Sequence, residues 1–347
     1  MLCSSMSYNR ILDTLYSTYY CSSDEFSNVT SSFWIEFGKR TKVMKRGDAF
    51  DISAYGISSF QKHEKETIRS ALRNKAIIFL NNLILRTKMK ANPSRGYSNH
   101  PKDYPLELDG PLNLMFSWLL LKHEAERRTS DCALEITTIL DNHFDIDHVK
   151  HILSYDLIDS YDLFNTKDWI CIIGDGHGFC ATLIKRIIPD AKIILINLGR
   201  NLLIDAYGFS QVFPYESAML VREELPDIQM MSHNILFMEA ENYELLNGLP
   251  ISLFINIASM GEMNMNVIQK YFDLMRSSSV EPHFYCCNRV EKKLPDETVI
   301  RFFDYPWDGS EILVDELCPW YQVYPTSKPP FWKPFDGPIH HRLVKLN

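Results

Sequence analysis

The chain has 347 residues, of which 46% are hydrophobic and 23% charged, and its formal net charge is −8 at pH 7. This composition is ordinary for a globular protein and excludes a disordered chain. A general nucleic-acid binder needs a basic surplus to neutralise phosphates, so we expect no nucleic-acid partner. The eight cysteines form no CxxC pair and show no zinc spacing, so we expect reduced thiols and predict no metal site.

The first ten residues carry neither a charged nor an apolar signal region, and no apolar run reaches 18 residues. We therefore expect no membrane span and a cytoplasmic location. The length favours two parts, which we place at residues 1–160, mainly helical, and at residues 161–347, an α/β domain. The sequence leaves a homo-oligomeric state open.

The N-terminal region is predicted from helical periodicity and from loop-forming residues. Apolar residues spaced three and four apart between Gln61 and Leu85 predict the clearest helix. The segment 86–111 is rich in Pro and Gly and is expected to be a long loop or lid over an acceptor site. Further helices are expected at residues 112–126, 132–143 and 147–155.

From residue 168 onward, short apolar runs alternate with helical patterns, which is typical of a parallel sheet with helices on both faces. We predict strands at residues 169–173, 192–196, 234–238, 251–256 and 283–287, and late strands at 298–303 and 321–324. Helices are predicted at residues 179–188, 201–213, 216–225 and 265–275.

The glycine-rich loop directly follows the first predicted strand and opens a helix. Its residues are Gly174, Asp175, Gly176, His177 and Gly178. Glycine lets the backbone turn tightly and approach a ligand where a Cβ would collide. A dinucleotide loop reads GxGxxG, whereas this loop reads GxGxG and is followed by a phenylalanine, so the spacing favours S-adenosylmethionine over a dinucleotide.

Other cofactor contacts are expected where the next strands end, because ligands of such sheets bind outside the carboxyl ends of the strands. The second strand ends at Asn197 and Leu198, the third at Glu239 and Ala240, and the fourth at Asn256. Glu239 is a candidate acceptor for an adenine amino group, and the Ala240 backbone is a candidate donor. Each of these residues could equally be a plain polar strand end.

Three further segments resemble the sugar O-methyltransferases of bacterial surface-polysaccharide gene clusters. They are Phe254–Asn264 (FINIASMGEMN), Phe284–Lys292 (FYCCNRVEK) and Asp304–Trp307 (DYPW). The resemblance covers about the last 180 residues, glycine loop included. It implies a Rossmann-like class I methyltransferase sandwich, S-adenosylmethionine as cofactor, and methyl transfer to a hydroxyl of a sugar nucleotide or glycan in polysaccharide biosynthesis.

The sequence departs from the family's pattern at two positions. Ile172 stands where a carboxylate usually precedes the loop, and Asn197 stands where an acid usually grips the ribose hydroxyls. An amide binds a hydroxyl without the strength of a charge-assisted bond. Asp175, inside the loop, is a candidate substitute.

A sugar hydroxyl is a poor nucleophile, so a base is expected near the methyl group. Glu262, just past the fourth strand, is the first candidate, and His177 in the loop is the second. Residues expected to bind the acceptor are Asn264, Asn288, Arg289, Tyr305 and Trp307. The pair His340–His341 alone is too weak a signal for a metal.

Three alternative functions remain at this point. A nicotinamide-dependent oxidoreductase is disfavoured by the absence of the third loop glycine. A methyltransferase-like binding protein without catalysis would account for the missing acids. A methyltransferase that acts on another small molecule or on a peptide amine would share the same cofactor site.

Overall fold

The structure is a computed structural model that describes residues 8–21, 30–47, 49–53, 113–142, 144–225, 233–326 and 331–347. The chain forms two compact units. The sheet unit comprises residues 1–56, 158–318 and 336–347, and the helical unit comprises residues 57–157 and 319–335. Within the N-terminal part that was predicted as residues 1–160, the described residues between 8 and 53 thus group with the sheet.

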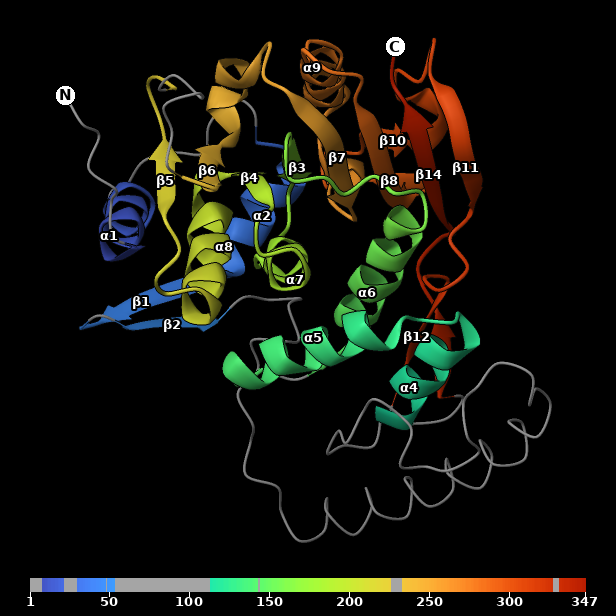
Figure 1. Ribbon diagram of the computed structural model, residues 1–347, viewed down its shortest axis with the longest axis horizontal. Coiled ribbons are helices and arrows are strands. Elements are labelled where there is room, and N and C mark those ends of the chain that lie inside the picture. Colours follow the sequence, from blue (N-terminus) through green and yellow to red (C-terminus); the bar gives the residue numbers. More distant parts are fainter. Residues whose placement is uncertain are drawn as a thin grey trace, which may run out of the picture. The chain divides into compact units, whose positions relative to one another are not determined.

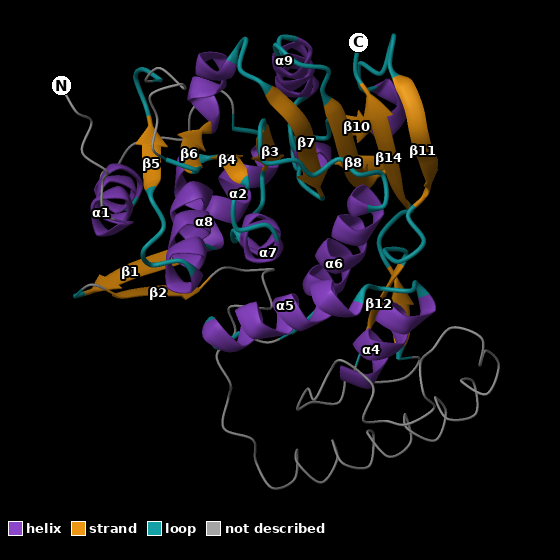
Figure 2. Ribbon diagram, viewed as in Figure 1, coloured by secondary structure: helices purple, strands orange, loops and turns teal. Residues whose placement is uncertain are grey.

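An eight-stranded sheet forms the centre of the sheet unit (Figures 1 and 2). Its order is β11-β14-β8-β7-β3-β4-β6-β5, and every pairing from β8 to β5 is parallel. β14 is antiparallel to both of its neighbours. The strands are β3 (Trp169–Ile173), β4 (Lys192–Asn197), β5 (Ala218–Val221), β6 (Ile235–Glu239), β7 (Ile251–Ile257), β8 (His283–Arg289), β11 (Glu311–Leu317) and β14 (Ile339–Lys345).

The strand order defines the fold class. With the edge strand β5 set aside, the seven other strands, numbered along the chain, lie in the order 3-2-1-4-5-7-6. The first five follow the doubly wound dinucleotide-binding order, but the last strand is inserted antiparallel beside the fifth. The fold is therefore the predicted Rossmann-like class I methyltransferase sandwich.

The five parallel strands that were predicted are present, and their side chains are buried on both faces of the sheet. All five residues of β3 are buried, as a strand covered by helices on both sides requires. Cys171 and Ile173 belong to the same core as Ile268 and Phe272 of α9 (Met265–Arg276). On the other face, Phe237 of β6 contacts Phe209 of α8 (Gly199–Val212). α7 (Phe179–Ile187) follows the glycine loop.

One predicted helix was wrong, and two further strands of the eight-stranded sheet were missed, besides strands of the smaller pairs. Residues 216–225 form no helix: Ala218–Val221 is β5, because its apolar residues pair in register with β6. The missed strands are β11 and β14, which close the opposite side of the sheet. Smaller antiparallel pairs are β1 (Lys42–Arg46) with β2 (Ala49–Ser53), in the region predicted to be helical, and β9 (Glu291–Lys293) with β10 (Val299–Arg301).

Two N-terminal helices complete the sheet unit. α1 (Tyr8–Tyr19) packs against α8 and lies beside the edge strand β5 (Figure 1). Such a cover protects an edge strand from pairing with other chains. α2 (Ser32–Arg40) follows.

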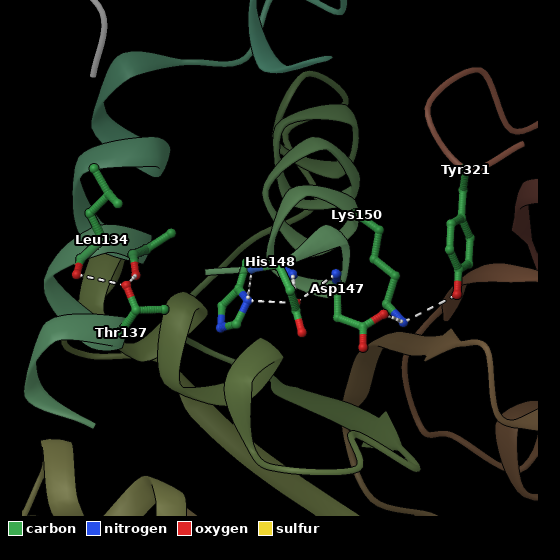
Figure 3. Close-up of polar contacts among 8 residues, drawn as sticks. Leu134, Thr137, Asp147, His148, Lys150 and Tyr321 are labelled. Carbon is green, nitrogen blue, oxygen red and sulfur yellow. Dashed lines mark hydrogen bonds and ion pairs between the residues drawn. The ribbon is translucent and has the colours of Figure 1, made fainter. Parts of the chain in front are cut away.

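The helical unit contains α4 (Asn113–Lys122), α5 (Arg127–Ile139), most of α6 (Ile146–Asp159) and the pair β12 (Val323–Pro325) with β13 (Trp332–Pro334). Figure 3 shows Lys150 of α6 between Asp147 and Tyr321, with its Nζ 2.8 Å from Asp147 Oδ1. Burial alone lowers the pKa of Lys150, but the attraction of Asp147 and Tyr321 outweighs it and raises the pKa. The predicted helix Gln61–Leu85 and the loop 86–111 lie outside the described residues.

No helix among the described residues is both long and apolar enough to cross a membrane.

Candidate functional site

A cavity lies at the carboxyl ends of β3, β4, β6 and β7, where the strand order reverses on either side of β3. Ligands of open α/β sheets bind at this switch point. Among the described residues, only one lining side chain is a cation, Lys270, and none is a carboxylate. The lining residues are Ser31, Trp34, Gly174, Ile196, Asn197, Leu198, Ala240, Tyr243, Ser259, Met263, Val267, Lys270 and Tyr271.

The glycine loop is packed too tightly for side chains at two of its three glycines. A Cβ on Gly174 would come within 2.3 Å of Ser259 Oγ, and one on Gly178 within 2.6 Å of the Asp205 carbonyl oxygen. A Cβ on Gly176 would meet nothing within 4 Å. All three glycines have positive φ angles of 73° to 89°, which other residues adopt at a cost. The loop therefore places bare backbone against the cavity at Gly174.

Asp175 of the loop holds the start of α7. Its carboxylate accepts hydrogen bonds from the backbone N–H of Cys180 at 3.0 Å and of Ala181 at 2.8 Å. These are donors that a helix start leaves without intrahelical partners. The side chain is buried and is not among the lining residues, so the structure does not bring this carboxylate to the cavity.

Asn197 lines the cavity at the end of β4, and both ends of its amide are used. Nδ2 donates to Asp205 Oδ2 at 2.8 Å, and Oδ1 accepts from the Leu198 N–H at 2.9 Å. Asp205 is fully buried on α8, and no hydrogen-bond partner of its Oδ1 lies in the described chain. Burial, and then the nearby Asp175, raise the pKa of Asp205 well above its ordinary value. Asp205 is thus a buried carboxyl behind the glycine loop.

Glu239 ends β6 and is engaged by two other elements. Its Oε1 accepts hydrogen bonds from Arg222 Nε at 3.1 Å and Nη2 at 2.9 Å. Burial, and then the proximity of Glu239, raise the pKa of Tyr19 of α1. Arg222 Nη2 also donates to Thr18 Oγ1 at 3.0 Å. Ala240, the next residue, lines the cavity.

Asn256 and Asn288 form a buried amide network beneath the site. Asn256 Nδ2 donates to the Ile173 carbonyl oxygen at 2.7 Å and to Ser259 Oγ at 2.5 Å. Asn288 Nδ2 donates to Asn256 Oδ1 at 2.8 Å, and Asn288 Oδ1 accepts from the Gly261 N–H at 3.1 Å. Both side chains are fully buried. They brace the ends of β3, β7 and β8, and they do not line the cavity.

Glu262, the first candidate base, lies in the turn after β7, between two lining residues, Ser259 and Met263. Its Oε1 is 2.5 Å from Lys292 Nζ, which in turn lies 4.1 Å from the centre of the Phe33 ring. The Ser31 hydroxyl donates to the Glu262 carbonyl oxygen. Glu262 is therefore next to a lining residue in the sequence, is not itself a lining residue, and is held by an ion pair.

The other predicted residues named next are not among those that line the cavity. His177 is buried, with its ring stacked on Phe179. Arg289 contacts Asp336, and Asn264 stands at the N-terminal end of α9. Tyr305 is buried in the core, and Trp307 packs against Phe272 and Phe284 of the same core.

Several lining residues were not predicted. Ser31 and Trp34 come from the N-terminal segment, and Tyr243 follows β6 in a 3₁₀ helix, Ala240–Leu246. Val267, Lys270 and Tyr271 lie on α9, where spacings of three and four residues put them on one face. That spacing was visible in the sequence, but an apolar helical face more often packs in the core.

His340 and His341 pair with carboxylates across the β14–β11 ladder. His340 Nε2 is 2.6 Å from Asp315 Oδ1, and His341 Nε2 is 3.5 Å from Glu316 Oε1. No group of three or more His, Cys, Asp or Glu side chains is arranged to hold a metal in the part of the chain that the structure describes.

No family model and no curated protein matches the sequence. Among solved structures, a Pyrococcus horikoshii protein described as an RNA methyltransferase is 9% identical, with 63% of this chain and 96% of that chain covered and a TM-score of 0.40. A SAM-dependent methyltransferase from Aquifex aeolicus is 9% identical, with 56% of this chain and 89% of that chain covered and a TM-score of 0.35. Coclaurine N-methyltransferase bound to N-methylheliamine and SAH is 11% identical, with 48% of this chain and 51% of that chain covered and a TM-score of 0.33. The absence of a nucleic-acid partner stays a prediction.

Proposed function

We propose that this chain is an S-adenosylmethionine-dependent methyltransferase that methylates a sugar hydroxyl. The observation that carries the proposal is the cavity at the switch point of the sheet, with Gly174 of the glycine loop in its wall. The sugar acceptor is supported by the resemblance of three sequence segments alone. When bound, the cofactor supplies an electrophilic methyl group.

The lining residues suit an adenosyl group in most respects. Tyr243, Tyr271 and Trp34 offer aromatic surface for a purine base. The bare backbone at Gly174 permits close approach, and Ser31 and Ser259 offer hydroxyl groups. The ribose hydroxyls lack an acid at the end of β4, where Asn197 stands. The cavity therefore fits the base and the loop contacts better than the ribose.

Glu262 is the group proposed to take the acceptor proton. Its neighbour in the sequence, Met263, lines the cavity, and the ion pair with Lys292 holds its carboxylate in place. To act as a base it must accept a hydrogen bond from the acceptor hydroxyl, and a carboxylate has acceptor sites left beyond one ammonium. The remaining rate enhancement comes from positioning of the acceptor hydroxyl against the methyl group.

Calorimetric titration with S-adenosylmethionine, S-adenosylhomocysteine and NADH tests the cofactor. We expect the two adenosyl ligands to bind and NADH not to bind. Tyr243→Ala should weaken adenosyl binding by about tenfold, because a stacked aromatic contributes about 1 kcal/mol or more. Tyr215→Ala is the matched control, because Tyr215 is 98% exposed and lies outside the cavity. An unchanged affinity in Tyr243→Ala would contradict the assignment of the cavity.

Transfer of a labelled methyl group to panels of sugars, sugar nucleotides, amines and short RNAs tests the acceptor. We expect transfer to a sugar hydroxyl, reduced about 100-fold or more in Glu262→Gln with cofactor affinity retained. Glu223→Gln, a change of an exposed acid, is the control. Transfer to amines or RNA alone would refute the sugar acceptor.

A binding protein without catalysis is the second candidate. It is favoured by one observation: Glu239 and Glu262, two carboxylates that each adjoin a lining residue in the sequence, are both in ion pairs. Cofactor binding without transfer to any acceptor class would support it.

A further inference from the structure

Lys270 is the one charged side chain among the described residues that line the cavity. It lies on α9 one turn beyond Val267, and these two residues and Tyr271 form the face that α9 presents to the cavity. Val267 and Tyr271 are buried, whereas Lys270 is exposed, so Lys270 belongs to the open rim of the cavity. A lysine offers three hydrogen-bond donors and no acceptor. It therefore suits a ligand group that accepts hydrogen bonds.

The ammonium of Lys270 is not neutralised by an acid of the elements around it. Within the described residues Lys270 takes part in no ion pair, and its Nζ lies 5.9 Å from the centre of the Tyr243 ring. The acids next to these two residues have other partners. Asp273 Oδ1, one turn further along α9, accepts from Gln269 at 2.9 Å, and Glu244 Oε1 accepts from the Tyr243 hydroxyl at 3.0 Å. A ligand that enters the cavity therefore meets an uncompensated ammonium.

Lys270 lies on the β6 side of the cavity, away from the turn after β7 that holds Glu262. α9 begins at Met265, near that turn in the sequence. A helix rises about 1.5 Å per residue, which puts Lys270 roughly 8 Å along the axis. There α9 packs against the 3₁₀ helix that follows β6, with the rings of Tyr271 and Tyr243 5.9 Å apart between centres. These rings belong to the aromatic surface proposed for the purine base, so the ammonium lies beside the base and not beside the reacting methyl group.

We propose that Lys270 donates a hydrogen bond to a ring nitrogen of the adenine base and so selects the base of the cofactor. The acceptors that adenine offers are N1, N3 and N7. Tyr243 acts as a positioning residue, because the attraction between an ammonium and an aromatic ring within about 6 Å holds Lys270 over the surface on which the base stacks. The inference rests on the proposed cofactor, and it makes α9 part of the base-binding site.

Calorimetry with two ligands separates the base from the amino-acid part of the cofactor. S-adenosylhomocysteine carries a carboxylate that is able to pair with an ammonium, and 5′-deoxy-5′-methylthioadenosine has the same base without it. Lys270→Met removes the donor, and we expect it to weaken both ligands by the same factor of about 5 to 20. Lys270→Arg keeps the charge and the donors and should lose less than about threefold. Lys293→Met, at an exposed lysine outside the cavity, should leave both affinities unchanged.

Three further ligands identify the ring nitrogen. They are the 1-deaza, 3-deaza and 7-deaza forms of S-adenosylhomocysteine, in each of which a C–H group replaces one nitrogen of the base. We expect the parent chain to bind one of the three more weakly than S-adenosylhomocysteine, by about the factor that Lys270→Met loses. Lys270→Met should bind that analogue and S-adenosylhomocysteine within about twofold of each other, because the two changes remove the same contact. The other two analogues should remain sensitive to Lys270→Met.

The outcomes are distinct. If the parent chain binds neither S-adenosylhomocysteine nor the methylthio ligand, the proposed cofactor and this inference both fail. If Lys270→Met weakens S-adenosylhomocysteine alone, the ammonium pairs with the carboxylate of the ligand. If Lys270→Met weakens no ligand, or weakens S-adenosylhomocysteine and all three deaza forms by the same factor, Lys270 contacts no ring nitrogen. In the last two cases the proposed function survives and Lys270 does not select the base.

Discussion

Gly178 in the glycine loop and Asp205 on α8 are in direct backbone contact: a Cβ on Gly178 would lie 2.6 Å from the Asp205 carbonyl oxygen. A second contact of the same kind joins Gly208 of α8 to the His177 carbonyl oxygen, again at 2.6 Å from a Cβ position. The loop that borders the cavity therefore packs directly against α8, with one glycine on each side of the contact. This contact fixes where α7 begins.

Gly178→Ala is predicted to destabilise the chain by about 2–5 kcal/mol. An alanine at a φ of +73° costs about 1–2 kcal/mol, and its methyl group would press on a backbone carbonyl that cannot turn aside, which adds about 1–3 kcal/mol. Urea unfolding measures the difference. Because the start of α7 would shift, we also expect weaker adenosyl binding.

Gly248→Ala provides the matched control. Gly248 has a φ of +78°, but a Cβ there would meet nothing within 4 Å. Only the backbone cost of about 1–2 kcal/mol should remain. Equal losses in the two variants would show that the contact with Asp205 contributes nothing.

Asp205→Asn is predicted to gain stability relative to the parent chain as pH rises. Burial and the nearby Asp175 raise the pKa of Asp205 above its ordinary value of 3.8. The folded chain therefore binds this proton more tightly than the unfolded chain. Its contribution is greatest below pH 3.8 and is lost as pH rises through the folded pKa. Asparagine cannot ionise, so the free energy of unfolding of the variant does not fall in this way as pH rises.

Urea unfolding of both proteins at about pH 5 and pH 8 measures the effect. We expect the unfolding free energy of the variant, relative to the parent, to improve by about 1 kcal/mol or more between the two pH values. Asp190→Asn, at an exposed site, should show no such trend. A difference independent of pH would mean that Asp205 is ionised in the folded chain throughout.

The central strands of the sheet could be predicted because each is a short apolar run. A strand such as Trp169–Ile173 is buried on both faces and leaves a plain signal in the sequence. β11 and β14 leave no such signal, because charged residues interrupt them, and several of these charges pair across the two strands. Arg342 donates to both oxygens of Asp315, 27 residues away in the chain. Such pairing depends on the strand register of the folded sheet, so neither segment predicts it alone.

The candidate site could likewise be predicted only where it depends on local sequence patterns. Gly174 of the glycine loop and the strand ends Asn197 and Ala240 follow from local rules, and these three residues line the cavity. The partners of Glu239 do not follow, because Tyr19 and Arg222 reach it from another helix and another strand. Trp34 enters the cavity wall from a helix that precedes the α/β domain by more than a hundred residues.

Ala258→Gly is predicted to stabilise the chain by about 0.5–1 kcal/mol. Ala258 ends β7 next to Ser259 of the cavity and has a φ of 64°, which its N–H bond to the Cys287 carbonyl oxygen helps to fix. Glycine relieves about 1–2 kcal/mol of backbone strain and adds entropy to the unfolded chain, which offsets part of the gain. Thermal unfolding is the measurement. Ala133→Gly, inside α5, should instead cost about 1 kcal/mol or more.

Tyr305→Phe separates a role in the core from a role in acceptor binding. Tyr305 was predicted to contact the acceptor, but it is buried, and its hydroxyl has no hydrogen-bond partner in the described chain. Removing an unpaired buried hydroxyl should leave stability unchanged or raise it by about 1 kcal/mol.

Tyr285→Phe is the opposite case, because the Tyr285 hydroxyl lies 3.2 Å from His341 Nδ1. Its loss should cost about 1 kcal/mol, because the buried His341 Nδ1 loses this hydrogen bond. Urea unfolding compares the two variants, and steady-state kinetics with the acceptor compares KM. An unchanged KM in Tyr305→Phe is expected of a core residue. A KM raised about tenfold at unchanged stability would instead return Tyr305 to the acceptor site, since a hydrogen bond to substrate is worth about that much.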